Sequence, residues 1–163
     1  MKKVTITVYK FNELSDEAKE NALNSLRDIN VDHDWWDAVY DDAENIGLKI
    51  TSFDLDRNRH AEGKFILPAY TVIQKILEDH GESCETYKTA TQFKDILTEE
   101  KEYDEEGYVP VEHEESEEEF LKSLLEDYSI MLQKEYEYLT SDEAIIETIE
   151  ANEYDFTENG KLY

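Results

Sequence analysis

The first residues of the chain alternate between apolar and polar side chains. In KVTITVYKF, residues 3–11, Val4, Ile6 and Val8 fall on one side of an extended chain and the threonines fall on the other. β-branched residues favour strands, and a period of two is typical of a strand with one buried face. The pattern therefore predicts a half-buried strand over residues 3–11.

The period of two returns between residues 48 and 67. The segments LKITSFDLD and HAEGKFIL flank a polar turn, which indicates an antiparallel hairpin with strands over 48–56 and 60–67. The apolar positions change parity near Thr51 and Ser52. A change of this kind predicts a β-bulge.

Apolar residues at three-and-four spacing indicate helices in most of the remaining chain. Ser15 and Ser141 each precede the sequence Asp-Glu-Ala, which is a typical helix start with an N-cap serine. Gly47 is a helix-stop signal. We expect six helices, which open at Asp16, Trp35, Pro68, residue 83, Ser116 and Asp142.

The most acidic stretch, residues 99–139, combines an acidic loop with a long amphipathic helix. Residues 112–119 hold six glutamates in eight positions, and their mutual repulsion is a cost that helix stability alone does not require. Ser116 and Glu119 match a capping box. The helix is therefore expected to begin at Ser116, after a loop that contains a glycine and a proline.

The pattern as a whole predicts an α+β fold. Its sheet is expected to be small and mainly antiparallel, built from residues 3–11, 48–56 and 60–67 and covered by helices on one side. Asn159-Gly160 is a signal for a type I′ hairpin turn, so 153–163 is a further candidate strand for this sheet. We expect one domain over residues 1–163, in which 1–98 supply sheet and helices and 99–163 supply a strongly acidic helical part with a C-terminal hairpin.

The excess of acidic residues restricts which partners the protein is able to bind. The chain has 42 acidic and 16 basic residues, and its net charge is −26, divided into −7 on residues 1–98 and −19 on 99–163. Such a surface excludes general phosphate binding and disfavours an anionic membrane, so metal ions or basic proteins are the expected partners. Solubility is the competing explanation for the charge. The single cysteine, Cys84, and the lack of a signal or membrane-spanning segment predict a cytoplasmic protein.

Residues 32–42 hold the clearest candidate for metal chemistry. Five aspartates and His33 offer hard oxygen ligands and one imidazole for a divalent ion. Most of these acids also fall on the polar face of the helix expected there, where solvated charge is normal. The histidines lack zinc-site spacing, and no glycine-rich phosphate loop occurs. We therefore expect no enzymatic activity, no cofactor and no metal site.

The acidic stretch is the candidate partner-binding surface. Carboxylates one helical turn apart are separated by about 6 Å along the axis, on the order of the phosphate spacing in a nucleic-acid strand. A surface that carries them is able to occupy a Lys/Arg groove built for DNA or RNA. The candidate residues are Asp104, Glu105, Glu106, Glu112, Glu114, Glu115, Glu117, Glu118 and Glu119.

Three stretches of the chain resemble a family of small acidic proteins encoded by phages and prophages. They are YKFNELSDEAKENAL, INVDHDWWDAVYDDAENIGLKITSFDLDRNRHAEGKF and LEDYSIMLQKEYEYLTSDEAIIETIEANEYDFTENGKLY, which together cover more than half of the chain. The resemblance is one of overall sequence, so it transfers no active-site residue. It implies a role similar to that of anti-restriction and anti-CRISPR proteins, which block host nucleases by imitating nucleic acid.

Charge and resemblance together lead to one hypothesis. The protein is expected to be a non-enzymatic anti-defence protein that inhibits a basic nucleic-acid-binding host protein, such as a restriction nuclease or a CRISPR effector, without binding nucleic acid or membranes itself. Two alternatives stay open. One is a metal-binding protein or metal-dependent enzyme that uses the Asp32–Asp42 cluster, and the other is an antitoxin-like or scaffolding protein that binds a basic partner.

Overall fold

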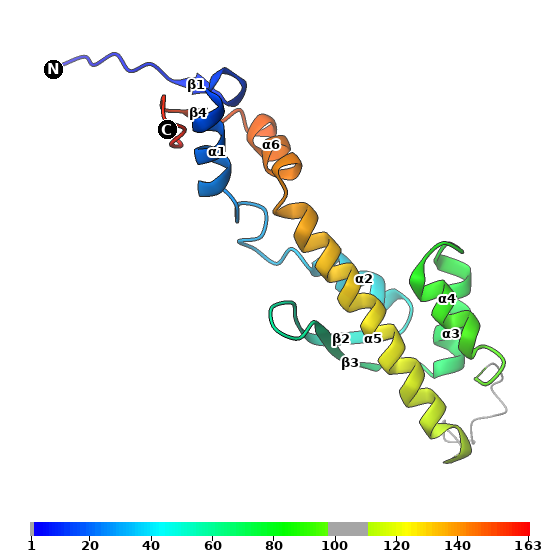
Figure 1. Ribbon diagram of the computed structural model, residues 1–163. Helices are drawn as coiled ribbons and strands as arrows, with labels where there is room; N and C mark the ends of the chain where they lie inside the picture. The colour runs from blue at the N-terminus through cyan, green and yellow to red at the C-terminus, as the bar shows by residue number, and fades with distance from the viewer. Residues whose placement is uncertain (1, 98–110) are drawn as a thin grey trace. The chain divides into compact units, whose positions relative to one another are not determined.

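The computed structural model of the chain describes residues 2–97 and 111–163, and of 111–114 only the backbone. Helices dominate, and the strands form antiparallel pairs, so the predicted α+β class is confirmed (Figure 1). In chain order the elements are β1 (Tyr9–Lys10), a 3-10 turn η1 (Phe11–Glu13), α1 (Asp16–Ser25), α2 (Asp37–Asn45), β2 (Leu48–Asp54), β3 (His60–Phe65), α3 (Ala69–Asp79), α4 (Glu85–Phe93), α5 (Val111–Leu139), α6 (Asp142–Ala151) and β4 (Asp155–Phe156).

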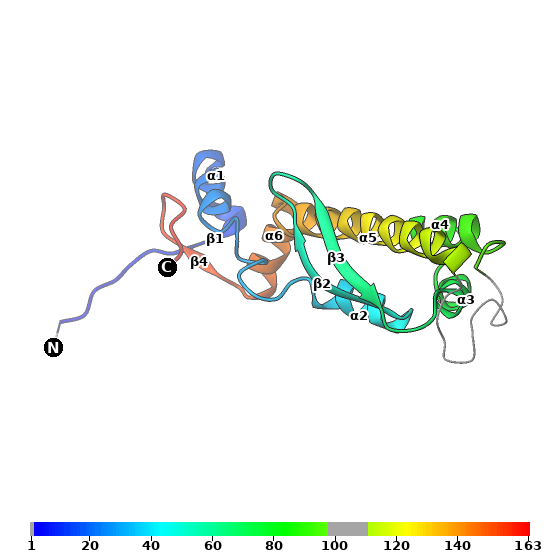
Figure 2. The same cartoon turned by 90° about the horizontal axis from the view of Figure 1, so that it is seen from below.

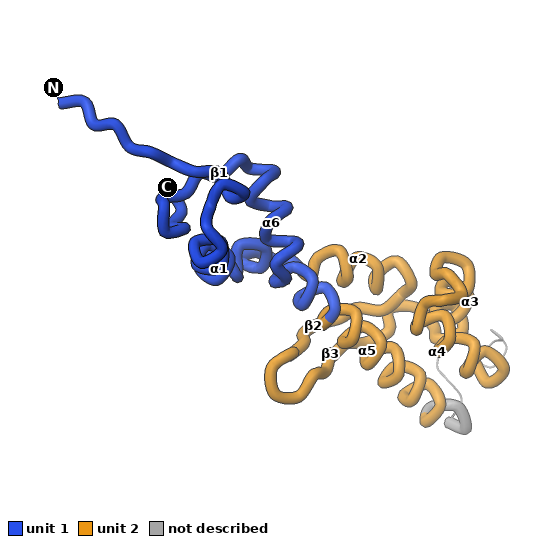
Figure 3. The backbone as a smooth tube through the Cα atoms, turned by 45° about the horizontal axis from the view of Figure 1, so that its top comes forward, with its two compact units in different colours: residues 1–35, 134–163 blue, residues 36–133 orange. Residues whose placement is uncertain are grey.

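The chain divides into two compact units (Figure 3). Unit 1 comprises residues 1–35 and 134–163, and unit 2 comprises residues 36–133. Helix α5 contributes to both, because the second boundary falls within it. These boundaries differ from residue 98, where the sequence analysis divided the chain by charge.

Unit 1 is built on two helices that start where the sequence predicted. The hydroxyls of Ser15 and Ser141 accept hydrogen bonds from the backbone N–H groups of Ala18 and Ala144, at 3.2 and 3.3 Å, and so cap α1 and α6. These two N-caps confirm the predicted helix starts. The helices and the β1–β4 pair share a core of Phe11, Leu14, Ala18, Ala22, Ile145, Ile149 and Phe156.

The N-terminal strand is much shorter than predicted. Residues 2–8 have no regular secondary structure, and only Tyr9–Lys10 pair with another strand, β4. Val4 is 73% exposed and Ile6 is 55% exposed. The prediction of a buried strand face over residues 3–11 is therefore wrong.

The cause lies in the partner strand. Tyr9 pairs with Phe156, so extending the ladder to Val8 would require Thr157. The N–H of Thr157 donates instead to the carbonyl of Lys161, at 2.8 Å, because the chain turns there. Strand β4 leaves the ladder at this point, and the preceding residues of β1 lose their partner.

The C-terminal turn lies where the sequence placed it but has a different type. The N–H of Gly160 donates to the carbonyl of Thr157, and Thr157 and Lys161 close a three-residue loop. Gly160 has a φ of 89°, whereas Asn159 has an ordinary negative φ. A type I′ turn needs positive φ at both central residues, so that prediction is wrong, and a three-residue turn with glycine in the left-handed position forms instead.

Unit 2 contains the predicted hairpin. Strands β2 and β3 pair antiparallel, from Leu48 opposite Phe65 to Asp54 opposite His60. The register shifts between Ile50 and Ser52, which confirms the predicted bulge. Of the described strands, none joins this pair to β1 and β4. The prediction that residues 3–11 belong to the same sheet as the hairpin is therefore wrong.

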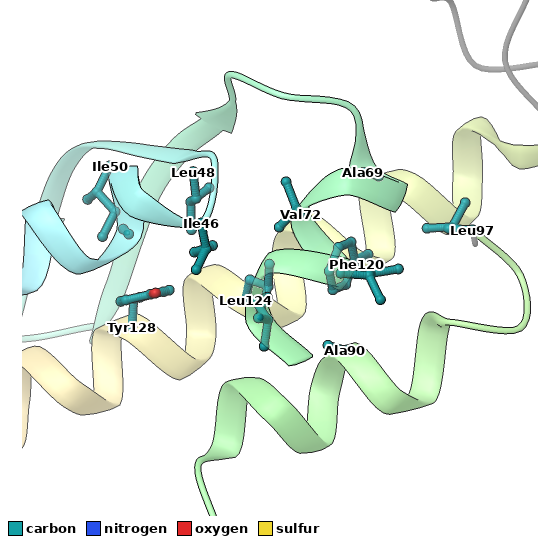
Figure 4. Packing of buried hydrophobic residues seen from close by; sticks show 13 residues of the cluster. Ile46, Leu48, Ile50, Ala69, Val72, Ala90, Leu97, Phe120, Leu124 and Tyr128 are labelled. Atoms are coloured by element: carbon teal, nitrogen blue, oxygen red, sulfur yellow. The ribbon is translucent and has the colours of Figure 1, made fainter. Parts of the chain in front are cut away.

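Helix α5 covers the hairpin and supplies the centre of the unit 2 core. A Cβ atom placed on Gly63 of β3 would lie only 3.2 Å from a methyl carbon of Leu125, so helix and strand approach closely (Figure 2). Phe120, Leu124 and Tyr128 follow one another at intervals of four on α5 and are fully buried. They pack with residues from α2, β2, α3 and α4 and from the segments that directly follow α2 and α4 (Figure 4), namely Ala43, Ile46, Leu48, Ile50, Ala69, Val72, Ile73, Ile76, Ala90 and Leu97.

Helix boundaries differ most from the prediction around the acidic stretch. Helix α5 begins at Val111, so Ser116 lies inside the helix and the predicted capping box is wrong. Helix α4 spans Glu85–Phe93 and is shorter than the predicted 83–98. Of the acidic loop expected before Ser116, residues 99–110 lie outside the described part of the chain, and residues 111–115 belong to α5. No helix in the described part is both long and apolar enough to cross a membrane.

Candidate partner-binding face of helix α5

Three carboxylates form the described part of the predicted acidic surface. Glu115, Glu118 and Glu119 are exposed on the side of α5 opposite its buried stripe, and we call them the acidic face. Glu115 and Glu119 are one turn apart, about 6 Å along the axis, and Glu118 lies between them on the same side. No hydrogen bond or ion pair joins any of the three to another described residue. Their charge is thus directed at solvent.

Glu117 does not belong to this face. It is half-buried, because it lies three residues before Phe120 and seven before Leu124, on the side of the helix that packs into the core. Composition alone predicts one surface from all the glutamates between 112 and 119. The helical period separates Glu117 from Glu115, Glu118 and Glu119.

The remaining candidate residues lie where the structure gives no side-chain position. Asp104, Glu105 and Glu106 lie outside the described residues. Glu112 and Glu114 belong to the first turns of α5, and of these only the helical backbone is described. They stay predicted members of the surface.

Beyond the acidic face, the same side of α5 carries a cation and an ion-paired carboxylate. Lys122 places a cation on the same side of α5 as the acidic face. Glu126, one turn further, accepts an ion-paired hydrogen bond from Arg59 at 2.6 Å, and Arg59 also donates to Gln133 at 3.0 Å. The Glu126 carboxylate therefore ties α5 to the hairpin turn, whereas the carboxylates of the acidic face form no such contact.

A polar network fixes the other side of α5. The hydroxyl of Tyr128 donates to Oδ2 of Asp42 on α2, at 2.8 Å. Nε2 of His80, at the end of α3, lies 3.3 Å from the same oxygen, and Nδ1 of His80 lies 2.6 Å from the hydroxyl of Thr86 on α4. Nε2 is poorly aligned for a hydrogen bond, so its attraction to Asp42 is mainly electrostatic. We call Asp42, His80, Thr86 and Tyr128 the Asp42 network.

The Asp42 network shifts the ionisation of its members in opposite directions. The His80 ring and the Tyr128 hydroxyl hold the pKa of Asp42 below its ordinary value, although partial burial of the carboxyl opposes them. Burial, together with the neighbouring Asp42 charge, raises the pKa of the Tyr128 phenol far above its ordinary value. Asp42 is thus a carboxylate and Tyr128 a neutral donor at neutral pH. The Asp42 network thus joins α2, α3, α4 and α5 through side chains, and two of its members, Tyr128 and Thr86, are buried.

A surface hollow of about 740 Å³ lies beside the acidic face, between β3, α4 and α5. Glu118 and Lys122 line it, together with the apolar side chains of Leu121 and Leu125. On its wall the hydroxyl of Thr89 donates to Asp127 at 2.6 Å. Burial raises the pKa of Asp127 above its ordinary value, and the Thr89 hydrogen bond opposes this rise in part.

The acidic cluster proposed as a metal site is not assembled as one. Asp42 points to His80 and Tyr128, and His33 lies 3.2 Å from the adjacent Asp32. Within the described ranges no group of three or more His, Cys, Asp or Glu side chains is placed to hold a metal ion.

Sequence reasoning missed the Asp42 network. The helical period groups Asp42 with Asp37 and Asp41, mostly opposite the apolar residues of this helix, and so predicts a solvated side chain. A signal was present in Tyr128, which belongs to the apolar stripe of α5 and carries a hydroxyl that requires a partner when buried. A buried tyrosine hydroxyl predicts that some residue accepts its hydrogen bond, but the sequence does not identify that residue.

Comparisons with known proteins give no further assignment. No family model matches the chain, and no curated protein and no solved structure matches it.

Proposed function

We propose that the protein is a non-enzymatic inhibitor that binds a basic, nucleic-acid-binding host protein and occupies its nucleic-acid groove. The observation that carries the proposal is the acidic face, in which Glu115, Glu118 and Glu119 are exposed, spaced along one helical side and unpaired within the described chain. A restriction nuclease or a CRISPR effector has the required Lys/Arg groove, and the phage-type resemblance of the sequence favours these partners.

Rigid support makes the acidic face suited to this role. Phe120, Leu124 and Tyr128 anchor the same helix in the core, so the carboxylates project from a fixed backbone. Pre-organised charges lose less conformational freedom on binding than charges on a mobile chain. The neighbouring carboxylates also repel one another in the free protein. A cationic partner surface reduces this repulsion, and the reduction favours association.

The first test is capture from host lysate with the immobilised protein at low salt. Steered association between complementary charges predicts that the captured partner dissociates as salt rises, since the Debye length is about 8 Å at physiological ionic strength. Duplex DNA or RNA should compete with the immobilised protein for the same partner. A partner that resists both salt and saturating nucleic acid would refute mimicry.

A matched pair of charge-reversal variants locates the binding surface. Glu115→Lys, Glu118→Lys and Glu119→Lys together should weaken binding of the captured partner about tenfold or more, since close interfacial charge pairs commonly couple by more than about 1.4 kcal/mol. Asp37→Lys, Asp41→Lys and Glu44→Lys on α2 change the net charge equally at exposed positions of the same unit. If both triple variants lose binding equally, overall charge and not the acidic face governs the interaction.

A further inference from the structure

Residues 2–8 form an extended segment that we call the N-terminal arm. Its alternating β-branched sequence is typical of a strand, yet Val4 and Ile6 are largely exposed. Figure 1 shows the arm leaving β1 in a direction away from α1 and α6. No backbone hydrogen bond joins the arm to any other described residue. The arm is therefore a strand-like sequence without a strand partner.

The chain itself removes the partner that the arm would need. Strand β4 turns away at Thr157, the residue that would otherwise pair with Val8. The arm continues directly from β1, whose Tyr9 is already in a ladder. Both edges of the arm thus carry backbone donors and acceptors that are free to pair with a strand of another molecule.

The arm is complementary to itself. Residues 4–8 read VTITV, which is the same in either direction. When two copies run antiparallel with Ile6 opposite Ile6, Val4 meets Val8 and Thr5 meets Thr7, so that one side of the ribbon is uniformly apolar and the other carries threonine pairs. Aliphatic pairs and Thr–Thr pairs are both favourable across strands.

The ends of this register are also compatible. Lys2 falls opposite Lys10 of the second copy, and Lys10 already forms an ion pair with Asp155 at 2.8 Å. That carboxylate offsets the like charges. A register displaced by two residues would set Val4 against Ile6 and Val8 against Lys2, and would lose the apolar match at one end.

We propose that the N-terminal arms of two copies pair as an antiparallel ribbon about a two-fold axis at Ile6, so that the protein forms a homodimer through this surface. The arrangement is isologous, since each copy gives and receives the same contacts. It goes beyond the proposed function and does not depend on it.

The size of the ribbon sets the expected strength of the dimer. In this register residues 2–10 of each copy are paired and span roughly 30 Å, and a two-stranded ribbon of this length buries less area than the roughly 1,600 Å² of a standard interface. The dimer is therefore expected to be reversible and to depend on protein concentration.

Sedimentation velocity over a range of protein concentrations tests the proposal. The parent should shift from monomer to dimer as concentration rises, and Ile6→Lys should raise the dimer Kd about tenfold or more by placing two cations face to face at the two-fold axis. Ile66→Lys is the matched control, because Ile66 is also an exposed isoleucine, 49% accessible, but lies in unit 2. Circular dichroism verifies that each variant is folded.

A mixing experiment tests the register itself. At a concentration where the parent is mostly dimeric, Ile6→Lys and Ile6→Glu should each be mostly monomeric alone, whereas an equimolar mixture should form a heterodimer, because residue 6 faces residue 6. A parent that is monomeric at every concentration would overturn the proposal. So would equal loss of dimer in Ile66→Lys, or a mixture that stays monomeric.

Discussion

Removal of one hydroxyl tests the role of the Asp42 network in unit 2. Tyr128→Phe keeps the buried ring and deletes the donor that lies 2.8 Å from Oδ2 of Asp42. A hydrogen bond to a charged group contributes about 1.5–3 kcal/mol when it is buried. Since Asp42 is partly exposed, water recovers part of this loss, and we expect the free energy of unfolding to fall by about 1–2 kcal/mol.

Urea unfolding, followed by tryptophan fluorescence and circular dichroism, measures this change. The same loss corresponds to a fall in Tm of about 2–8 °C if the whole chain unfolds together, and of about 4–16 °C if unit 2 unfolds by itself. Tyr138→Phe is the matched control, because its hydroxyl also donates to a carboxylate, Glu147, at 3.1 Å, but in an exposed position. Water replaces that bond, so the control should unfold at the same urea concentration as the parent.

The effect of Tyr128→Phe should depend on pH. The pKa of Asp42 is lower in the folded protein than in the unfolded chain, so its charged interactions stabilise the fold above the unfolded pKa, near 4, and are lost as pH falls through the folded pKa. The loss of unfolding free energy caused by Tyr128→Phe should therefore reach its full value at about pH 7 and be smaller at about pH 3. An equal difference at both pH values, or a variant as stable as Tyr138→Phe, would refute the reasoning.

Two further substitutions examine other parts of the structure. Gly160→Ala should destabilise unit 1 by about 2 kcal/mol or more, because Gly160 has a φ of 89° and an added Cβ would collide with the Ala18 carbonyl; thermal unfolding measures the loss. Gly81→Ala, where a Cβ meets nothing within 4 Å, is the control and should not destabilise the protein. Asp127→Asn should stabilise unit 2 at neutral pH, because burial raises the pKa of Asp127 and its charge costs stability once pH exceeds the unfolded pKa, whereas an asparagine oxygen still accepts from Thr89. This gain should vanish at about pH 3, and urea unfolding that shows the same gain at both pH values would contradict the assignment to charge.

Local chemistry was sufficient wherever the controlling interactions span a few residues. The Ser15 and Ser141 caps, the bulge near Thr51 and the buried stripe of α5 depend on hydrogen bonds and periodicity within one or two turns of chain. The sequence contains all the partners of such interactions. Helix identity, the hairpin and the α+β class could therefore be predicted.

The candidate site was only partly predictable. The acidic composition of residues 112–119 marks the stretch, but the helical phase set by Phe120, Leu124 and Tyr128 decides which glutamates face solvent. The sequence contained that phase, and applying it residue by residue would have separated Glu117 from Glu118. The members of the acidic face can therefore be predicted from the sequence, provided that the helix is known to begin before residue 112.

Two features were decided only by contacts between distant parts of the chain. The alternation at Val4, Ile6 and Val8 determines that the arm is suited to a strand, but whether it is buried depends on how far β4 continues beside it, and β4 turns at Thr157. In the same way, the hydroxyl of Tyr128 determines that an acceptor is needed, while Asp42, 86 residues earlier in the chain, becomes that acceptor only through the packing of α2 against α5. Propensity and period are short-range properties, and a strand partner or a buried acceptor is supplied by tertiary structure.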